Sequence, residues 1–358
     1  MNLLELTRSY YPSIGGYEKS IKDKTRIYDS LGIAYRIVTT DFNISGQEKN
    51  RLPNVVYMKQ YTPYNITPSI VRHLRGEYDV VNINSIGRFF GDFAIRYFSK
   101  RGVKIILTPH SMYHTDRYAV AKRFLQTTIF PGLLERVHFL IAFSEYEKSL
   151  WVSKYGFDNE RVVVIPHYVD EIILENTNNA FATDERYILY LGRNGGNKRP
   201  DLLVKAFLEN KEIKSSLYLT VDKHSFEPSV VKAISNDKRI HCLGTVSEER
   251  KDQLLRNADA VAIPTEWEAF GYVAFEASQY SKPLLCSALP VFRELLDPKG
   301  TLFFENKISS VSAVLRHYER LDEKEIKTMG EVNHRNLSRY TFEQSTTKYR
   351  LLFERVQK

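Results

Sequence analysis

The sequence is poor in cysteine and has no long hydrophobic run. Its 358 residues include two cysteines, and each lies in a short apolar segment, Cys242 in RIHCL and Cys286 in PLLC. Such surroundings predict reduced thiols in buried strands and argue against a disulfide or a metal site. No apolar run approaches the roughly 18 residues of a membrane-spanning helix, and the start, MNLLELTRSYYP, has no signal-peptide pattern. The sequence therefore predicts a cytoplasmic protein that does not span a membrane.

Several common ligand-binding signatures are absent as well. The chain contains neither a GxGxxG fingerprint nor a P-loop, so nicotinamide cofactors and ordinary NTPase chemistry are poorly supported. Basic residues are scattered and no recognition module is visible, which argues against a nucleic-acid partner. Hydrophobic (43%) and charged (26%) residues occur in the proportions of an ordinary globular enzyme. We therefore expect a chain that folds on its own and needs no cofactor.

Apolar strands alternate with amphipathic helices along the whole chain. The first half contains NLLELT, AYRIVTT, DVVNI, VKIILTP, FLIAFS and RVVVIP, with a helix expected from about Gly16 to Leu31. After a polar, asparagine-rich segment the pattern restarts with YILYLG, SLYLTV, RIHCL, AVAIP and PLLC. Short strands separated by helices indicate parallel sheets with helices on both faces, and 358 residues exceed the usual size of one core. The sequence thus predicts an α/β protein with two doubly wound, Rossmann-like domains.

The predicted boundaries divide the chain into three parts. The two domains are expected at residues 1–165 and 166–335, and a final helix within 336–358 is expected to cross back onto the first domain. Doubly wound domains bind ligands at the carboxyl ends of their strands. With two such domains, the expected ligand site is the cleft between them.

One segment, EAFGYVAFE from Glu268 to Glu276, is the strongest indication of function. It follows an apolar strand, and it places two carboxylates on either side of a glycine turn that opens a helix. The amides near Phe270, Gly271 and Tyr272 would lie at the positive end of that helix and suit an anionic ligand. Glu276, about one turn later, would point back toward the same end. The pattern favours a phosphate with a polyol on each side of it.

Two other interpretations of this segment stay open. A loop followed by a helix with two surface glutamates is a common arrangement that needs no functional explanation. The carboxylates could also be a glycosidase pair, but eight residues of helix span about 12 Å, whereas a retaining hydrolase needs roughly 5 Å. A loop could close that gap, so a hydrolase is disfavoured without being excluded.

Two further clusters come after predicted strands and could contact a phosphate. Gly15 and Gly16 form a tight turn between the first strand and the first helix, where a backbone can approach a phosphate or a sugar closely. In LGRNGGNKRP, Arg193 leaves a strand and Lys198 precedes a helix. Arginine offers a diphosphate a bidentate fork and lysine a point charge. Taken singly, an ordinary turn and a solvated basic loop explain these patterns as well.

A histidine ends the strand in ILTPHSMYH. His110 lies just beyond this strand, and His114, a weaker candidate, lies on the helix expected after it. A single histidine is more often structural than catalytic. His110 becomes a candidate because it stands at the carboxyl end of a predicted parallel strand.

In order and spacing, these motifs resemble the retaining glycosyltransferases of family 4, which have the GT-B fold. The resemblance covers almost the whole chain through PSIGG, TPH, FSEYEKSLWVSKYG, VVVIPHYVD, LGR with a lysine five residues after the arginine, EAFGYVAFEAS and SALPVFREL. The combination of E-x7-E with GR-x4-K is specific. The resemblance implies transfer of a hexose, with retention, from a nucleotide-sugar donor to a glycan or lipid-linked acceptor in cell-envelope or glycoconjugate synthesis.

The resemblance also implies roles for the candidate residues. Arg193 and Lys198 would hold the donor diphosphate, and Glu276 the ribose hydroxyls. Glu268, together with the amides of residues 270–272, would engage the donor sugar and phosphate. His110 would sit beside the reacting carbon, and the turn at residues 15–16 would line the opposite wall.

The chain departs from the family pattern at three points. The usual asparagine-glycine after the last strand of the first domain is His167-Tyr168, which puts local nucleotide contacts in doubt, and the usual proline of EPFG is Ala269. No D-x-D pair is present, so the metal-chelating signature of the other large glycosyltransferase fold is missing. Charge on the leaving diphosphate would then be stabilised by Arg193, Lys198 and a helix dipole without a metal.

The resemblance leaves the donor and the activity partly open. SALPVFREL is similar to the corresponding segment of mannosyl-type members, which favours GDP-mannose over UDP-sugars. A nucleotide-sugar epimerase or a phosphorylase of related architecture is the alternative enzyme, although no phosphorylase cofactor-lysine motif is recognisable. A catalytically inactive GT-B subunit that only binds is the alternative from outside the enzymes.

The net charge of +8 lies entirely in the first half. Residues 1–165 contain 23 Lys and Arg against 15 Asp and Glu, and the remainder is neutral. Arg117, Lys122 and Arg123 alternate with aromatic and aliphatic residues in RYAVAKRFL. A basic amphipathic helix of this kind can lie on an anionic membrane, and a half-buried helix with a solvated basic face explains the pattern equally well. The first of these interpretations predicts a peripheral association with the inner face of the cell membrane.

Overall fold

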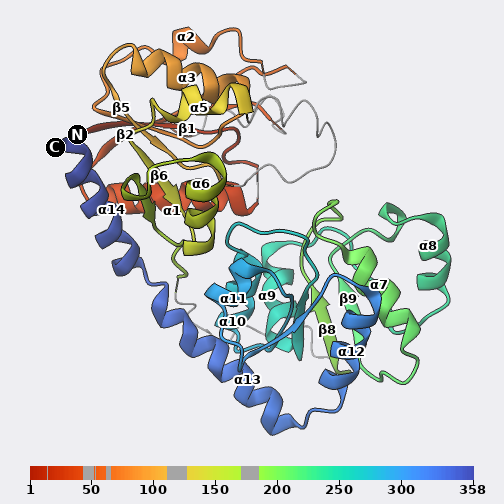
Figure 1. Cartoon of the computed structure of the whole chain (residues 1–358). Helices are drawn as coiled ribbons and strands as arrows, with labels where there is room; N and C mark the ends of the chain where they lie inside the picture. The colour runs from red at the N-terminus through yellow and green to blue at the C-terminus, as the bar shows by residue number, and fades with distance from the viewer. Residues whose placement is uncertain (14, 43–51, 53, 62–65, 111–126, 171–184) are drawn as a thin grey trace. The chain divides into compact units, whose positions relative to one another are not determined.

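The protein consists of two compact units, which are described separately (Figure 1). A computed structural model describes residues 1–358 except 14, 43–51, 53, 62–65, 111–126 and 171–184. Unit 1 comprises Met1–Tyr168 and Phe342–Lys358, and unit 2 comprises Val169–Thr341. The predicted segment of Arg117, Lys122 and Arg123 lies outside the described residues, as does His114.

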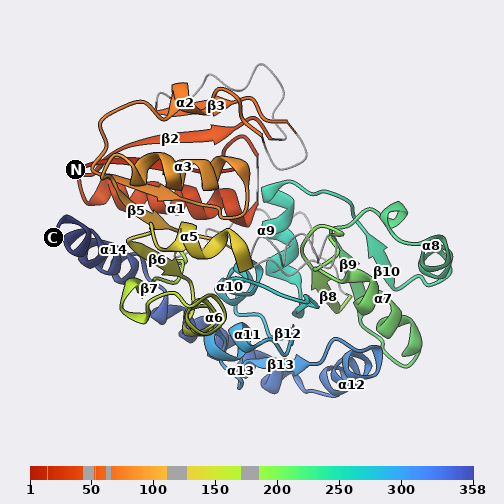
Figure 2. The same ribbon diagram turned by 45° about the horizontal axis from the view of Figure 1, so that its top comes forward.

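Unit 1 is built on a parallel sheet that has seven strands in the described residues. The strand order is β3-β2-β1-β4-β5-β6-β7, so β2 and β3 lie toward one margin and β6 and β7 toward the other (Figure 2). The strands are β1 (Asn2–Leu6), β2 (Ala34–Thr40), β3 (Val55–Met58), β4 (Val80–Ile83), β5 (Lys104–Leu107), β6 (Phe139–Ala142) and β7 (Val162–Val164). The order reverses between β1 and β4, where doubly wound folds bind ligands.

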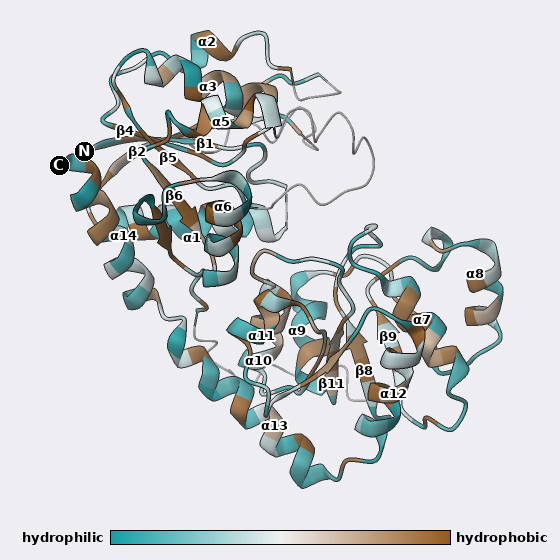
Figure 3. Cartoon of the chain, viewed as in Figure 1, coloured by the Kyte–Doolittle hydropathy of each residue, from teal (hydrophilic) through white to brown (hydrophobic). Residues whose placement is uncertain are grey.

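Helices cover both faces of this sheet. They are α1 (Gly16–Ser30), α2 (Ile70–His73), α3 (Phe89–Ser99), α5 (Phe130–Leu134), α6 (Glu145–Tyr155) and α14 (Phe342–Gln357), with a short 3-10 turn, η1 (Asn159–Arg161). Because successive strand residues point to opposite faces, Leu4 and Leu6 join the large apolar core with α3, α5 and α6. Leu3 and Glu5 face the other way, toward the side of α1 and α14. The strands are correspondingly the most hydrophobic part of the unit (Figure 3).

The last helix belongs to unit 1 although its sequence follows unit 2. In α14, Tyr349 and Phe353 meet Tyr28 of α1 edge-on, with ring centroids 6.3 and 5.9 Å apart. Figure 1 shows the two helices side by side. The preceding Tyr340 stays with unit 2, because its hydroxyl donates to the Leu295 carbonyl at 2.8 Å in a buried position. The chain therefore returns to unit 1 at Phe342, and α14 lies within residues 336–358.

Unit 2 repeats the same architecture. Its described residues form a parallel sheet of six strands in the order β10-β9-β8-β11-β12-β13, which again reverses, here between β8 and β11. The strands are β8 (Tyr187–Tyr190), β9 (Ser216–Leu219), β10 (Ile240–Cys242), β11 (Ala260–Ile263), β12 (Leu284–Ser287) and β13 (Thr301–Phe304). The helices are α7 (Pro200–Glu209), α8 (Pro228–Ser235), α9 (Glu248–Asn257), α10 (Tyr272–Gln279), α11 (Pro290–Leu295), α12 (Ile308–Glu319) and α13 (Glu323–Asn336), with 3-10 turns η2 (Lys223–Ser225) and η3 (Leu337–Arg339).

The structure confirms the predicted α/β class and two doubly wound parallel sheets. It adds two strands that the sequence pattern did not predict, β3 and β13, and both are edge strands of four residues. Their sequences, VVYM and TLFF, are apolar but short, and a run of this length does not distinguish a strand from part of a helix. Cys242 and Cys286 are both free thiols. Across the ranges given above, no helix combines the length and the hydrophobicity needed to cross a bilayer.

Candidate functional site

In unit 2, the predicted cationic loop and the predicted acidic loop meet where the strand order reverses. The loop after β8 carries Lys198 and the loop after β11 carries Glu268, and β8 and β11 are adjacent strands. The ammonium nitrogen of Lys198 lies 2.5 Å from Glu268 Oε2, and both side chains are partly accessible to solvent. Two residues 70 positions apart are thus brought into one ion pair at the carboxyl edge of the sheet.

Hydrogen bonds hold these two loops together. The Asn197 carbonyl accepts from the Glu266 amide at 2.7 Å and from the Thr265 hydroxyl at 2.9 Å. Arg199 adds an ion pair to Glu266 at 2.5 Å. The residues on either side of Lys198, Asn197 and Arg199, are therefore both bonded to the loop after β11.

Arg193 is the exposed cation of this edge. Its carbonyl accepts from the Tyr190 hydroxyl at 3.0 Å, which ties the loop to the end of β8. Burial raises the pKa of Tyr190 well above its ordinary value, so the hydroxyl keeps the proton that it donates. In the described part of the chain the Arg193 guanidinium makes no hydrogen bond or ion pair. It is therefore available to an anion.

The turn that opens α10 requires glycine. Gly271 has φ +89°, and a Cβ atom there would lie 2.4 Å from Cε1 of the buried Phe292. No side chain caps the first turn of α10. Phe270 is buried and stacks on Phe275 with ring centroids 4.2 Å apart, so its side chain anchors the turn in the core. Only Glu276 of the two glutamates is helical, since α10 begins at Tyr272 and Glu268 lies in the preceding loop.

Glu276 has a lysine partner that the sequence reasoning missed. Lys251 of α9 lies 3.7 Å from Glu276 and 2.6 Å from Glu248. Burial by itself would lower the pKa of Lys251, but the two carboxylates raise it above the ordinary value. The i,i+3 spacing of Glu248 and Lys251 was readable in the sequence, whereas the approach of α9 to α10 was not.

In unit 1, the glycine turn and the histidine both belong to the carboxyl edge of the sheet. Gly15 caps α1 and Gly16 begins it, directly before Tyr17. The Tyr17 hydroxyl accepts from the Thr7 hydroxyl at the end of β1 and donates to the carbonyl of Asn84 at the end of β4. Tyr17 thus joins the glycine turn to the point where the strand order of unit 1 reverses.

His110 lies against Tyr17 and has an unusual backbone. Its φ is +59°, a conformation that a residue other than glycine rarely adopts. The rings of Tyr17 and Phe143 lie 4.5 and 5.3 Å from the His110 ring, and that of His167 lies 6.4 Å away. Burial, together with the charge of Lys24 and the neighbouring His167, lowers the pKa of His110 well below the usual range. His110 is therefore a neutral imidazole at pH 7.

A fully buried polar cluster underlies His110. Glu5 of β1 pairs with Lys24 of α1, and both side chains are inaccessible to solvent. Asn84 donates to Glu5 Oε1 at 2.7 Å and accepts from Lys24 at 2.5 Å. His110 Nε2 lies 2.8 Å from the same Asn84 oxygen. On the far side, the Tyr28 hydroxyl donates to Glu5 Oε2 at 2.9 Å. Glu5, Lys24, Asn84 and Tyr28 were not among the predicted site residues.

The structure thus groups the predicted residues by unit. In unit 2, Lys198 contacts Glu268, and Arg193 lies on the same loop as Lys198. Gly271 precedes α10, and Glu276 lies within it. Unit 1 brings the turn at residues 15–16 close to His110 through Tyr17. His167, a departure from the family pattern, lies in the same aromatic group, with its ring centroid 4.0 Å from that of Phe143 and the two rings tilted by 35°.

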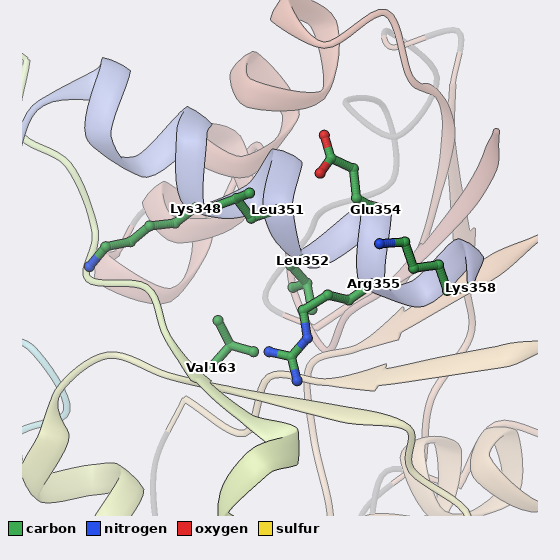
Figure 4. A pocket seen from close by; sticks show the side chains of 7 residues that line it. All are labelled: Val163, Lys348, Leu351, Leu352, Glu354, Arg355 and Lys358. Carbon is green, nitrogen blue, oxygen red and sulfur yellow. The ribbon is translucent and has the colours of Figure 1, made fainter.

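A separate groove lies elsewhere on unit 1. It runs between α14 and the edge strand β7, and Figure 4 shows its lining by Val163, Lys348, Leu351, Leu352, Glu354, Arg355 and Lys358. Arg355 is engaged there, because it donates to the Glu160 carbonyl at 2.6 Å and lies over the Phe139 ring. No residue of the two strand-end clusters contributes to this groove.

Comparison with known proteins agrees with this architecture. Residues 14–171 match Glycosyltransferase Family 4, and residues 173–331 match Glycosyl transferases group 1. The D-inositol 3-phosphate glycosyltransferase of Mycobacteroides abscessus is 26% identical over 208 residues, which are 52% of this chain and 46% of that protein, so the chain spans about half of this relative. The GDP-mannose:cellobiosyl-diphosphopolyprenol alpha-mannosyltransferase of Komagataeibacter xylinus is 23% identical over 309 residues, 82% of this chain and 77% of the relative.

A solved structure gives the same fold. The Anabaena protein HepE, crystallised with UDP and glucose, superposes with a TM-score of 0.76 at 15% identity, over 98% of this chain and 99% of HepE. Two doubly wound units of this kind define the GT-B fold. The chain belongs to the group 1 glycosyltransferases of family 4.

Proposed function

We propose that the chain transfers a hexose from a nucleotide-diphosphate sugar with retention at the anomeric carbon and without a metal ion. The observation that carries this proposal is the contact between Lys198 and Glu268 at the carboxyl ends of β8 and β11. It brings a cation and a carboxylate together where the strand order reverses, and Arg193 is exposed on the same loop as Lys198. Doubly wound sheets bind nucleotides at this position.

The proposed chemistry separates charge along the donor. Breaking the bond between the sugar and the diphosphate develops positive charge on the sugar and negative charge on the leaving group. Arg193 and Lys198 would stabilise the diphosphate, together with the uncapped start of α10 after Gly271. Glu268 would accept hydrogen bonds from sugar hydroxyls and Glu276 from the ribose. His110 would lie beside the reacting carbon of the sugar, as the family resemblance implies.

Substitution of the two cations tests this proposal. Arg193→Ala and Lys198→Ala should each lower kcat on the order of 100-fold, the scale expected for loss of one transition-state donor. Lys211→Ala is the matched control, because this lysine is highly exposed and pairs with Asp237 beyond the opposite end of α7. The anomeric configuration of the product, read by NMR, tests retention, and turnover in excess EDTA tests metal independence. Wild-type kinetics in both variants would refute the assignment.

The donor is proposed to be GDP-mannose, with UDP-sugars as the alternative. The relative from Komagataeibacter xylinus is named for GDP-mannose, whereas HepE was crystallised with UDP. A thermal-shift screen of GDP, UDP and ADP with their sugars discriminates, because a ligand that binds the folded state raises Tm by mass action. A larger shift with UDP-sugars than with GDP-mannose would reverse the choice.

Incubation with donor alone separates the remaining alternatives. An epimerase would convert the nucleotide sugar without any acceptor, whereas a transferase needs the acceptor for turnover. An inactive subunit would bind the donor calorimetrically and never turn it over. Neither result is expected if the proposed transfer is correct.

The acceptor is proposed to be a glycan or a lipid-linked sugar at the cytoplasmic face of the membrane. The relative from Komagataeibacter xylinus is named for a diphosphopolyprenol acceptor. Arg117, Lys122 and Arg123, outside the described residues, would dock the chain on anionic lipid at about 1 kcal/mol per basic residue. Co-sedimentation with anionic and neutral liposomes at low and high salt checks this. Equal binding by a variant with glutamate at all three positions would favour a soluble acceptor.

A further inference from the structure

The orientation of the Asn84 amide is determined by its neighbours. Its Nδ2 group faces two acceptors, Glu5 Oε1 at 2.7 Å and the Leu6 carbonyl at 3.0 Å. Its Oδ1 atom faces the amino group of Lys24 at 2.5 Å. A flipped amide would set oxygen against two acceptors and nitrogen against a donor. Lys24 carries N-H donors whether or not it is charged, so the orientation does not depend on its protonation.

This orientation decides which nitrogen of His110 carries the proton. Because Asn84 Oδ1 can only accept, His110 Nε2, at 2.8 Å, must donate to it. A neutral imidazole has one N-H, so Nδ1 is then the unprotonated nitrogen. In the part of the chain that the structure describes, Nδ1 has no hydrogen-bond partner of its own.

The surroundings of His110 also oppose a positive charge on it. Lys24 contacts the same Asn84 oxygen, and the titratable rings nearby are those of Tyr17 and His167. Burial raises the pKa of Tyr17 to about 12 and lowers that of His167 well below the usual range, so both are neutral at pH 7. Among the described residues, no carboxylate contacts the imidazole; Glu5 acts on it only through Asn84.

We propose that Glu5, Lys24 and Asn84 form a buried positioning network that holds His110 neutral and in the Nε2-H tautomer, so that Nδ1 is presented as a hydrogen-bond acceptor to a hydroxyl group of a bound sugar. The network connects β1, α1 and β4 to His110 in the loop after β5. The tautomer assignment stands on the geometry of unit 1 alone, whereas the role toward a sugar rests on the proposed function.

Nitrogen NMR of the histidine side chains tests the tautomer directly. The protein, labelled with 15N-histidine, is measured by long-range 1H-15N correlation, and His110 is identified by the signal that His110→Gln removes. We expect an Nε2-H pattern that persists below the ordinary histidine pKa of about 6.5. An Nδ1-H pattern, or a charged ring at neutral pH, would overturn the proposal.

Variants test whether the network sets this state. In Glu5→Leu/Lys24→Met both charges are removed together, and we expect a mixture of tautomers and protonation at higher pH. Tyr28→Phe is the matched control, because it removes a hydrogen bond to Glu5 without touching Asn84 or His110. If the double variant does not fold, Asn84→Ala removes the accepting oxygen while Glu5 and Lys24 keep each other. An unchanged His110 spectrum in these variants refutes the network's role.

Kinetics separate this inference from the proposed function. If both are correct, Glu5→Leu/Lys24→Met lowers kcat roughly 10-fold, the scale of lost outer hydrogen-bond partners, with KM for the donor little changed. It also moves the acid limb of the kcat profile to higher pH. Spectra that change as expected with unchanged turnover would support the positioning network and contradict the role of His110 in transfer.

Discussion

The two units share one strand order but use charged residues in different ways. In unit 2, the pair Lys198–Glu268 lies at the strand ends and its lysine side chain is 34% exposed. In unit 1, the pair Glu5–Lys24 lies within the sheet–helix layer and is buried. An exposed pair can exchange its partner for a ligand at little cost, whereas a buried pair cannot separate without leaving a charge in a medium of low polarity.

Under the proposed function, this difference separates residues that contact a ligand from residues that orient such a group. The cations of unit 2 are placed where a diphosphate can reach them. The buried pair of unit 1 reaches the strand end only through Asn84, which orients His110. A lysine–glutamate pair is thus accessible to a ligand in unit 2, whereas in unit 1 it orients another side chain.

Breaking the buried pair should have the largest effect on stability. Lys24→Met leaves Glu5 buried without its cation, and we expect unit 1 to lose about 3–5 kcal/mol. Each unit holds one tryptophan, Trp151 in unit 1 and Trp267 in unit 2. Urea unfolding followed by fluorescence in a Trp267→Phe background therefore reports on unit 1. A loss below about 1 kcal/mol would show that the pair behaves like a surface pair.

The turn before α10 tests how far unit 2 depends on a backbone feature. Gly271→Ala meets both positive φ and a contact of 2.4 Å with Phe292, so we expect a loss on the order of 2–4 kcal/mol and weaker donor binding. Gly244→Ala is the control, since Gly244 has φ +69° with nothing within 4 Å of a Cβ atom. Urea unfolding followed by Trp267 fluorescence in a Trp151→Phe background gives the stability loss of each variant. Equal losses would mean that φ alone matters.

A buried carboxyl in unit 1 should make stability depend on pH. Burial raises the pKa of Glu147 to about 7 from 4.5, while its Oε2 accepts from the Phe143 amide. The folded state therefore holds a proton that the unfolded chain releases above pH 4.5. Stability from this group is present below that pH and falls as pH rises to about 7, by up to about 3 kcal/mol. Glu147→Gln should flatten the profile between about pH 5 and 8, measured by urea unfolding at each pH.

Breaking the exposed pair should have the smallest effect on stability. Lys198→Ala is expected to change the free energy of unfolding of unit 2 by less than about 1 kcal/mol, although it lowers kcat strongly. Lys211→Ala, which removes a 70% exposed lysine from its pair with Asp237, should match it in stability and keep wild-type turnover. A stability loss in Lys198→Ala as large as that in Lys24→Met would remove the contrast between the two units.

Much of unit 2 was predictable because its site is local in sequence. Glu268, Gly271 and Glu276 lie within nine residues, and Arg193 and Lys198 within six, so spacing alone placed each set on one strand-to-helix connection. The partner Lys251 was missed because it comes from α9, whose approach to α10 no local pattern records. Local motifs therefore identified residues at the strand ends and left out the lysine that pairs with Glu276.

Unit 1 shows the opposite balance. Its strands and the helix after Gly16 were predicted from hydrophobic alternation, but Glu5, Lys24 and Asn84 look like ordinary polar residues in their elements. They become a network only because strand order brings β1 beside β4 and α1 over both. His110 could be placed at a strand end, yet its neutral state depends on groups far away in the chain.

The sequence by itself determined the alternation of strands and helices, the parallel doubly wound class and the residues at strand ends, because hydrophobic periodicity and glycine turns act within a few positions. Tertiary structure alone decided which charges pair, which charges are buried and which ring nitrogen of His110 is proposed to carry the proton. Those properties depend on distances and on the local exclusion of water between residues up to about 80 positions apart, as for Glu5 and Asn84. Burial turns a weak surface attraction into a strong constraint, and a linear pattern does not contain that information.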